Sequence, residues 1–207
     1  MLAPSPLKTI WTTPRETVRR IIERDPAYGV ILITCLLGLD RSLSNAMNRN
    51  LGDRFSTSSI LLLACVLGPL GGLLTLWIGS YLIRWTGTWL GGTASRAHLR
   101  TAMAWSGIPA LVAMPLWIPE LLVFGSELFT AETSRIDDSP AKLALLVGFS
   151  LIELVLGIWS FVLLCHTVAE VQTYRSAWRA LSNLVLAGLV AVVPIVLLAF
   201  LLMSLGR

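Results

Sequence analysis

One carboxylate stands in the middle of a long apolar stretch, where an ionisable side chain is costly. Glu153 lies within the segment SLIELVLGIW, and a charge at the centre of a bilayer costs on the order of 2.5–3.5 kcal/mol on insertion scales. Such a side chain usually faces a bundle interior or a wet cavity, where it can bind an ion, a proton or a lipid headgroup. The alternative is a protonated carboxyl that only hydrogen-bonds a neighbouring helix. We favour this structural role, because no partner cation accompanies Glu153.

The rest of the sequence supplies no catalytic or metal-binding pattern. It contains no G-x-S-x-G, H-E-x-x-H or P-loop motif and no CxxC spacing. The three cysteines, Cys35, Cys65 and Cys165, lie inside apolar stretches, which is typical of small packing residues. We therefore predict that the protein is not an enzyme and that it uses no cofactor and no metal.

The elements that would position Glu153 are five apolar stretches long enough to cross a membrane. Hydrophobic residues make up 55% of the chain and charged residues 14%, against about 25% charged in ordinary soluble domains. A hydrocarbon core of ~30 Å needs ~20 apolar residues as a helix. We predict an all-α polytopic membrane protein, a five-helix transmembrane bundle over residues 28–207. The expected spans are Tyr28–Ala46, Ile60–Ile83, Ala102–Val123, Leu143–Cys165 and Leu184–Leu205.

The distribution of Lys and Arg predicts the orientation of this bundle. These residues are concentrated in the N-terminal segment and in the second and fourth connections between spans. Positive charge marks the cytoplasmic side of a membrane protein. We expect the N-terminus inside and, with five spans, the C-terminus outside, in a bacterial inner membrane. The net charge of +4 follows from this topology and gives no reason to expect nucleic acid as a partner.

Residues 1–27 form a separate N-terminal segment that predicts a short interfacial helix. No apolar core precedes Tyr28, so this segment is not typical of a cleavable signal peptide. Thr13 and Glu16 have the spacing of a capping box, and Pro14 suits the first helical position. Val18, Ile21 and Ile22 share one helical face, whereas Arg19, Arg20 and their neighbours cover the rest. This amphipathic helix would lie on the inner membrane surface or pack its apolar face on the bundle.

The second and third predicted spans contain residues that shape helix packing. Small residues recur every fourth position at Ala64, Gly68 and Gly72, which allows close helix approach, as an internal contact more often than a dimer seam. The third span should be broken by three prolines. Glu120 follows the last proline, and we expect it to meet water at the outer end. The prolines are Pro109, Pro115 and Pro119.

Several stretches, taken in order, resemble the Yip family of Ypt/Rab-GTPase-interacting membrane proteins, specifically its prokaryotic branch. They are Trp11–Thr17 (WTTPRET), Gly91–Ser95 (GGTAS) with Leu99–Trp105 (LRTAMAW), Ile158–Phe161 (IWSF), Ala169–Gln172 (AEVQ) and Ala177–Leu181 (AWRAL). The resemblance implies a five-span bundle with a cytoplasmic N-terminus. Eukaryotic members bind prenylated Rab GTPases and act in vesicle traffic. This chain lacks their long polar N-terminal region, so the resemblance does not carry Rab-type GTPase binding over to it.

The family-like motifs are divided between two connections, and we predict that these form one cytoplasmic surface. Its candidate residues are Arg96, Arg100, Glu170 and Arg179, with Glu170 close to one of the arginines. The leading functional hypothesis is a non-enzymatic integral membrane protein that organises the bilayer or membrane-protein partners, including a homo-oligomer. The alternative is a small transporter or lipid-translocating protein with a midplane site around Glu153, because such sites use midplane carboxylates and broken helices.

Overall fold

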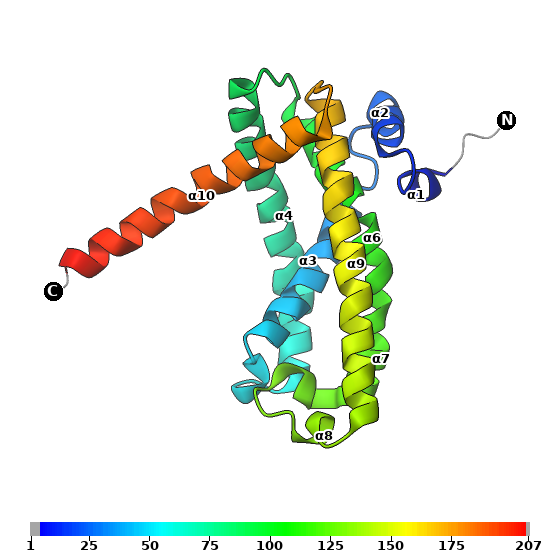
Figure 1. Cartoon of the computed structure of the whole chain (residues 1–207), viewed down its shortest axis with the longest axis vertical. Helices are drawn as coiled ribbons and strands as arrows, with labels where there is room; N and C mark the ends of the chain where they lie inside the picture. The colour runs from blue at the N-terminus through cyan, green and yellow to red at the C-terminus, as the bar shows by residue number, and fades with distance from the viewer. Residues whose placement is uncertain (1–4, 206–207) are drawn as a thin grey trace. The chain divides into compact units, whose positions relative to one another are not determined.

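The computed structural model describes residues 5–205, and these contain helices and no strand (Figure 1). Within these residues, three short 3₁₀ turns, η1 to η3, separate some of the α-helices. The helices are α1 (Pro6–Thr9), α2 (Pro14–Arg24), α3 (Val30–Asn48), α4 (Thr57–Trp89), α5 (Arg96–Ser106), α6 (Ile108–Ala113), α7 (Trp117–Phe124), α8 (Ser134–Asp137), α9 (Pro140–Val171) and α10 (Ala177–Leu205), and the turns are η1 (Leu51–Asp53), η2 (Met114–Leu116) and η3 (Gly125–Phe129).

Five helical segments are long and apolar enough to cross a membrane, which confirms the predicted all-α polytopic fold. Four of them extend well beyond the apolar stretches, since their polar ends continue the helical hydrogen bonding into the connections. The first predicted span, whose apolar run is interrupted by Asp40 and Arg41, forms one continuous helix, α3, through both residues. The segments are Val30–Asn48, Thr57–Trp89, Arg96–Phe129, Pro140–Val171 and Ala177–Pro194.

The chain divides into two compact units, each assembled from separate stretches of sequence. Unit 1 comprises Met1–Tyr28, Leu76–Met103 and Leu164–Arg207, and unit 2 comprises Gly29–Thr75 and Ala104–Leu163. The N-terminal segment therefore shares its unit with the C-terminal parts of α4 and α9 and with the beginning of α5.

Within unit 2, glycines allow the backbones of α3 and α4 to touch. A Cβ atom at Gly38 would overlap the carbonyl oxygen of Gly68 and lie 3.0 Å from the Cα of Gly72. A Cβ atom at Gly72 would in turn lie 2.6 Å from the carbonyl oxygen of Thr34. The small-residue pattern of the second span thus forms an internal helix contact, as expected. Beside it, Ala64 belongs to a buried cluster that also contains Leu43, Ala46, Ile60, Trp117, Phe124, Leu128, Phe129 and Ile136.

The third span is interrupted as its prolines predict. Helix α5 ends at Ser106, α6 begins after Gly107, and η2 separates α6 from α7. The pyrrolidine rings remove backbone N–H donors, so the regular hydrogen-bond ladder stops at these positions. Pro109 and Pro115 occupy the first turns of α6 and η2, where a missing N–H costs least.

The prediction that Glu120 meets water is wrong. Its residue surface is only 4% exposed, and Trp117 and Phe124 on the same helix are equally buried. These residues lie at i, i+3 and i+7, so they share one face of α7. Trp117 and Phe124 belong to the buried cluster of unit 2, so this face of α7 packs against protein. Glu120 lies on the same face and is buried for this reason.

Candidate functional site

Helix α2 is packed into unit 1 through one apolar face. Val18 is fully buried and Ile21 is 4% exposed, whereas Ile22 is half-buried. Residues 18 and 21 are one turn apart, and Thr17 beside them is also buried. Of the two arrangements that the amphipathic pattern allowed, the structure shows the apolar face covered by protein.

An ion pair fastens α2 to the end of α9. The Arg19 guanidinium lies 2.6 Å from a carboxylate oxygen of Glu170, and Arg19 Nε also donates a hydrogen bond of 2.7 Å to it. Figure 1 shows α2 beside this end of α9. The hydrogen bond and the negative charge of Glu170 raise the pKa of Arg19 above its ordinary value. Both nitrogens contact the same carboxylate oxygen, Oε1, and this charge-assisted contact holds Arg19 of α2 at Glu170.

Further hydrogen bonds hold both ends of this helix to the same unit. Arg15 Nη1 donates to the carbonyl oxygen of Tyr174 at 3.3 Å. Beyond the C-terminal end of α2, the hydroxyl of Thr101 donates to the carbonyl oxygen of Pro26. The N-terminal segment is therefore attached through α2 and Pro26 to the end of α9, to the connection after α9 and to α5.

The capping box predicted at Thr13 and Glu16 is wrong, although α2 begins at Pro14 as expected. The Thr13 side chain makes no cap hydrogen bond; its hydroxyl donates to the carbonyl oxygen of Thr9 at 3.1 Å. The same carbonyl oxygen, at the end of α1, also accepts a hydrogen bond of 2.9 Å from the backbone N–H of Thr13. Glu16 lies 3.9 Å from Arg20 on the next turn instead.

A buried polar cluster in unit 1 joins the connections after α4 and α9 to helices α4 and α10. Gln172 accepts a hydrogen bond from the backbone N–H of Ala94 at 3.1 Å and donates to the carbonyl oxygen of Ile83 at 3.2 Å. Asn183 donates to the same carbonyl and accepts from the hydroxyl of Thr86 at 2.7 Å. Both amides are at most 1% exposed. We call Ile83, Thr86, Ala94, Gln172, Tyr174 and Asn183 the amide cluster.

Two glycines make room for this cluster. A Cβ atom at Gly87 would overlap the side-chain amide of Gln172, and one at Gly92 would overlap its amide oxygen. The Tyr174 hydroxyl donates to the carbonyl oxygen of Gly87 at 3.1 Å, and burial raises the pKa of this phenol. The family-like stretches at residues 91–95 and 169–172 therefore form a close, hydrogen-bonded contact with each other.

The three arginines predicted for the shared surface each lie over an aromatic ring. The Cζ of Arg100 is 4.2 Å from the ring centre of Trp77, and that of Arg96 is 5.8 Å from Tyr81. Arg179 lies 5.5 Å from the ring of Tyr174. The ion pair of Glu170 is made with Arg19 of α2 and with none of these three arginines, which were its expected partners. A guanidinium over an aromatic face is attracted to the ring by its quadrupole.

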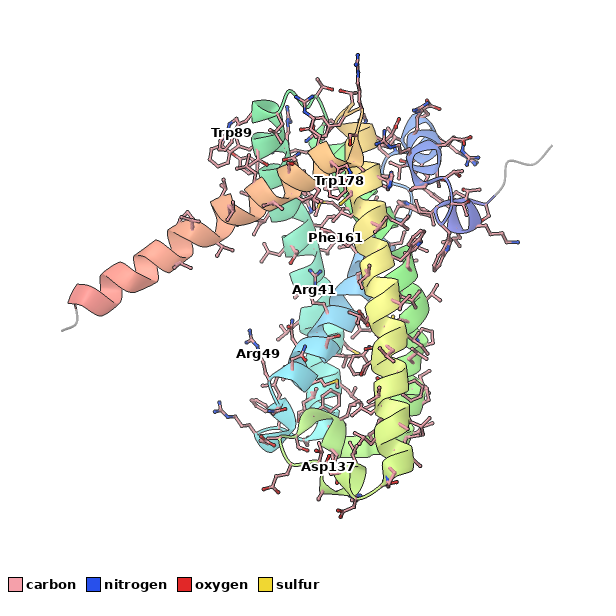
Figure 2. All side chains as sticks on the ribbon, in the orientation of Figure 1. Arg41, Arg49, Trp89, Asp137, Phe161 and Trp178 are labelled. Carbon is pink, nitrogen blue, oxygen red and sulfur yellow. The ribbon has the colours of Figure 1, made fainter. Side chains whose placement is uncertain are left out.

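Large aromatic side chains are exposed on the same unit. Trp85 and Trp89 pack edge to face on α4 with ring centres 5.3 Å apart. Trp89 and Trp178 project from α4 and α10 in Figure 2, and Trp178 is 77% exposed. Indole rings favour the headgroup level, where their apolar body and N–H group are both satisfied.

Unit 2 brings the predicted midplane residue Glu153 near two other carboxyl groups. Glu153 is half-buried on α9, and Glu120 is buried on α7 of the same unit. Asp40 on α3 also belongs to this unit and accepts a hydrogen bond of 2.9 Å from Trp117 Nε1. Across residues 5–205, no group of His, Cys, Asp or Glu has an arrangement that could hold a metal ion.

These features define the protein as an all-helical polytopic membrane protein. The profile of the Yip1 domain matches residues 8–204. Since this match covers nearly the whole sequence, the chain belongs to the Yip1 domain family. No curated protein and no solved structure matches it.

Several residues of the candidate site were not selected from the sequence, although their positions in it indicated burial. Asn183 and Thr86 each stand among apolar residues at the edge of a span, and an isolated amide in such a place indicates a buried hydrogen-bond partner. Asp40 interrupts the first apolar run in the same way. Polar residues inside spans usually face protein, and this rule could have selected Asp40 and Glu120 together with Glu153.

Proposed function

We propose that this Yip1-domain protein is a non-enzymatic membrane protein of the prokaryotic branch that organises the bilayer or membrane-protein partners. It would lie in a bacterial inner membrane with its N-terminus in the cytoplasm and its C-terminus outside. The observation that carries the proposal is the fixed attachment of α2 to unit 1 by Arg19 and Glu170. An amphipathic helix held in this way displays its remaining basic side chains at one level, where they can act on lipid headgroups.

The buried chemistry of unit 1 supports a structural role for its polar groups. The amides of Gln172 and Asn183 are engaged by backbone groups and by Thr86. A catalytic site needs a nucleophile, a base and oxyanion donors that converge on one open position. The amide cluster is instead filled by its own hydrogen bonds and by close glycine contacts.

Reconstitution into vesicles tests the proposal. Purified protein is inserted into vesicles of phosphatidylcholine and phosphatidylglycerol at increasing protein-to-lipid ratios, and vesicle size and shape are recorded by electron cryomicroscopy. We expect vesicle shape to change with protein density, the effect to weaken in Arg19→Glu, and the double variant R19E/E170R to restore it. Vesicles identical to protein-free ones at every ratio, together with a monomeric protein, would contradict the proposal.

The alternative is transport or lipid translocation through a site around Glu153. The presence of Asp40, Glu120 and Glu153 in the spans of one unit favours it, since carboxyl groups inside spans are typical of proton and cation pathways. Sealed vesicles containing a pH-sensitive dye distinguish the two functions. Proton flux that Glu153→Gln abolishes while the fold persists would establish transport, and equal traces with and without protein would exclude proton transport.

A further inference from the structure

A pocket of about 450 Å³ lies between α1 and α2 in unit 1 and is not used by the contacts described above. Thr17, Arg20, Ile21 and Arg24 line it from one face of α2, as their spacing of three or four residues requires. Its other walls come from α1 and from the segment after α2, namely Pro6, Thr9, Asp25 and Tyr28. The pocket therefore combines two guanidinium groups with hydroxyl and apolar surfaces.

Arg20 is positioned in this wall by α1. One terminal nitrogen of its guanidinium, Nη2, donates to the hydroxyl oxygen of Thr9 at 3.3 Å, and the same oxygen accepts a hydrogen bond of 2.8 Å from the Thr17 hydroxyl. Arg20 Nε is buried and has no hydrogen-bond acceptor among the described residues. Glu16, at 3.9 Å, is too distant to accept from it. Because Nε is shielded from solvent, a ligand in the pocket would meet the terminal nitrogens of Arg20 and Arg24, and such charged donors favour an anionic oxygen as their acceptor.

The charge balance of the pocket favours an anion. Arg20 and Arg24 contribute two positive charges, and Asp25 contributes one negative charge. The Asp25 carboxylate accepts a hydrogen bond of 2.9 Å from the backbone N–H of Ala27. This bond holds the carboxylate in the turn that follows α2. Guanidinium groups bind phosphate through parallel N–H···O bonds, which makes a phosphate group the best chemical match.

The apolar part of the wall and its place in the chain indicate which molecule carries the phosphate. Ile21 and Tyr28 line the pocket, and Tyr28 precedes by two residues the helix that begins at Val30 and forms the first span. Glu170, to which α2 is fastened, lies one residue before the end of the fourth span. Both neighbours place the pocket at the level of lipid headgroups.

We propose that the pocket between α1 and α2 binds the phosphate group of an anionic phospholipid, with Arg20 and Arg24 as its cations and Thr9 as the residue that positions Arg20. This inference rests on the proposed function for its choice of a bilayer ligand. The phosphate would accept hydrogen bonds from both guanidinium groups, and the adjoining glycerol and acyl carbons would contact Ile21 and Tyr28. Binding would hold α1 and α2 together at the membrane surface.

Retention of phosphatidylglycerol by the purified full-length protein, counted by native mass spectrometry, tests the site. We expect the double variant R20Q/R24Q to weaken retention by about tenfold or more, since a charge-assisted hydrogen bond contributes about 1.5–3 kcal/mol. The control K8Q/R175Q removes two exposed cations that do not line the pocket and should bind like the wild type. Thr9→Val keeps every charge and should weaken retention less strongly.

The outcomes separate this inference from its alternatives. Equal retention by R20Q/R24Q and wild type would overturn it, and so would an equal loss in K8Q/R175Q, because that would indicate attraction by net charge alone. Inorganic phosphate is titrated in parallel: binding of the free ion without binding of the lipid would overturn the lipid assignment. Unchanged vesicle shape with normal lipid retention would contradict the proposed function while leaving the pocket intact.

Discussion

Arg19 and Glu170 form an ion pair of 2.6 Å although 151 residues separate them in the chain. Glu170 is largely buried at the end of α9, with 16% of its side chain exposed, whereas Arg19 is 59% exposed on α2. The partly buried partner makes this contact more specific than an ordinary surface pair, whose contribution is small. It places the N-terminal helix against the membrane-spanning part of its own unit, and both proposals depend on that placement.

The glycine contact between α3 and α4 predicts a large effect for a small substitution. Gly38→Ala should lower the free energy of unfolding by about 1–3 kcal/mol, because its Cβ would overlap the backbone of Gly68. Gly71→Ala is the matched control, since a Cβ there meets nothing within 4 Å. Helix propensity alone should make that variant neutral or more stable by about 0.5–1 kcal/mol. Unfolding in mixed micelles measures the stability of both variants. Equal free energies of unfolding for Gly38→Ala and Gly71→Ala would contradict the close contact between α3 and α4.

The amide cluster predicts that Gln172 is required for stability. Gln172→Leu keeps a similar volume but removes the acceptor of the Ala94 N–H, which is buried. An unsatisfied buried donor costs about 1–3 kcal/mol, and thermal unfolding in detergent should show a loss of that size. Ser182→Ala removes a hydrogen bond from an exposed side chain and should change stability by less than about 0.5 kcal/mol. A Gln172→Leu protein as stable as the wild type would refute this role.

The buried phenol of Tyr174 predicts a loss of stability at alkaline pH. Burial raises its pKa in the folded protein above the unfolded value of ~10. The folded state then holds its proton more tightly, so the stabilisation is complete below pH ~10 and is lost as pH rises through the folded pKa. The difference in unfolding free energy between wild type and Tyr174→Phe should shrink across that range. A difference independent of pH would show that Tyr174 ionises alike in both states.

Orientation in the membrane is tested by labelling two exposed positions in intact cells. The native cysteines Cys35, Cys65 and Cys165 are replaced by serine, and single cysteines are introduced at Thr93 or Asp137. Asp137 lies in α8, between the third and fourth spans (Figure 2). With the N-terminus in the cytoplasm, a membrane-impermeant maleimide should label position 137 and leave position 93 unlabelled. The opposite pattern would reverse the proposed topology.

The helices could be predicted from the sequence because their signals are local. Apolar length determined the five spans, and Pro14 marked the start of α2. Side-chain contacts could not be predicted in this way. The Thr13 hydroxyl could cap α2 or donate to the carbonyl oxygen of Thr9, and the turn after α1, in which the Thr13 N–H also bonds that oxygen, favours the second.

Burial of polar residues depended on contacts between distant segments. Glu120 follows a proline near the end of its span, so its position suggested water, but the face of α7 that it shares with Trp117 is turned into unit 2. Gln172 and Ile83 are 89 residues apart, and no periodicity within either helix indicates that they meet. The charge pattern suggested arginine partners for Glu170 but did not identify Arg19, because it could not show that α2 reaches α9.

The distance between α2 and the connection after α9 tests the central structural claim most directly. Nitroxide labels at Glu23 and Arg175, both exposed in unit 1, are placed in a background without native cysteines, and their separation is measured by pulsed electron resonance in lipid nanodiscs. We predict one narrow distance distribution, a broad one in Arg19→Glu, and a narrow one again in R19E/E170R. A broad distribution in the protein with native Arg19 and Glu170 would contradict the attachment of α2 on which the proposed function rests.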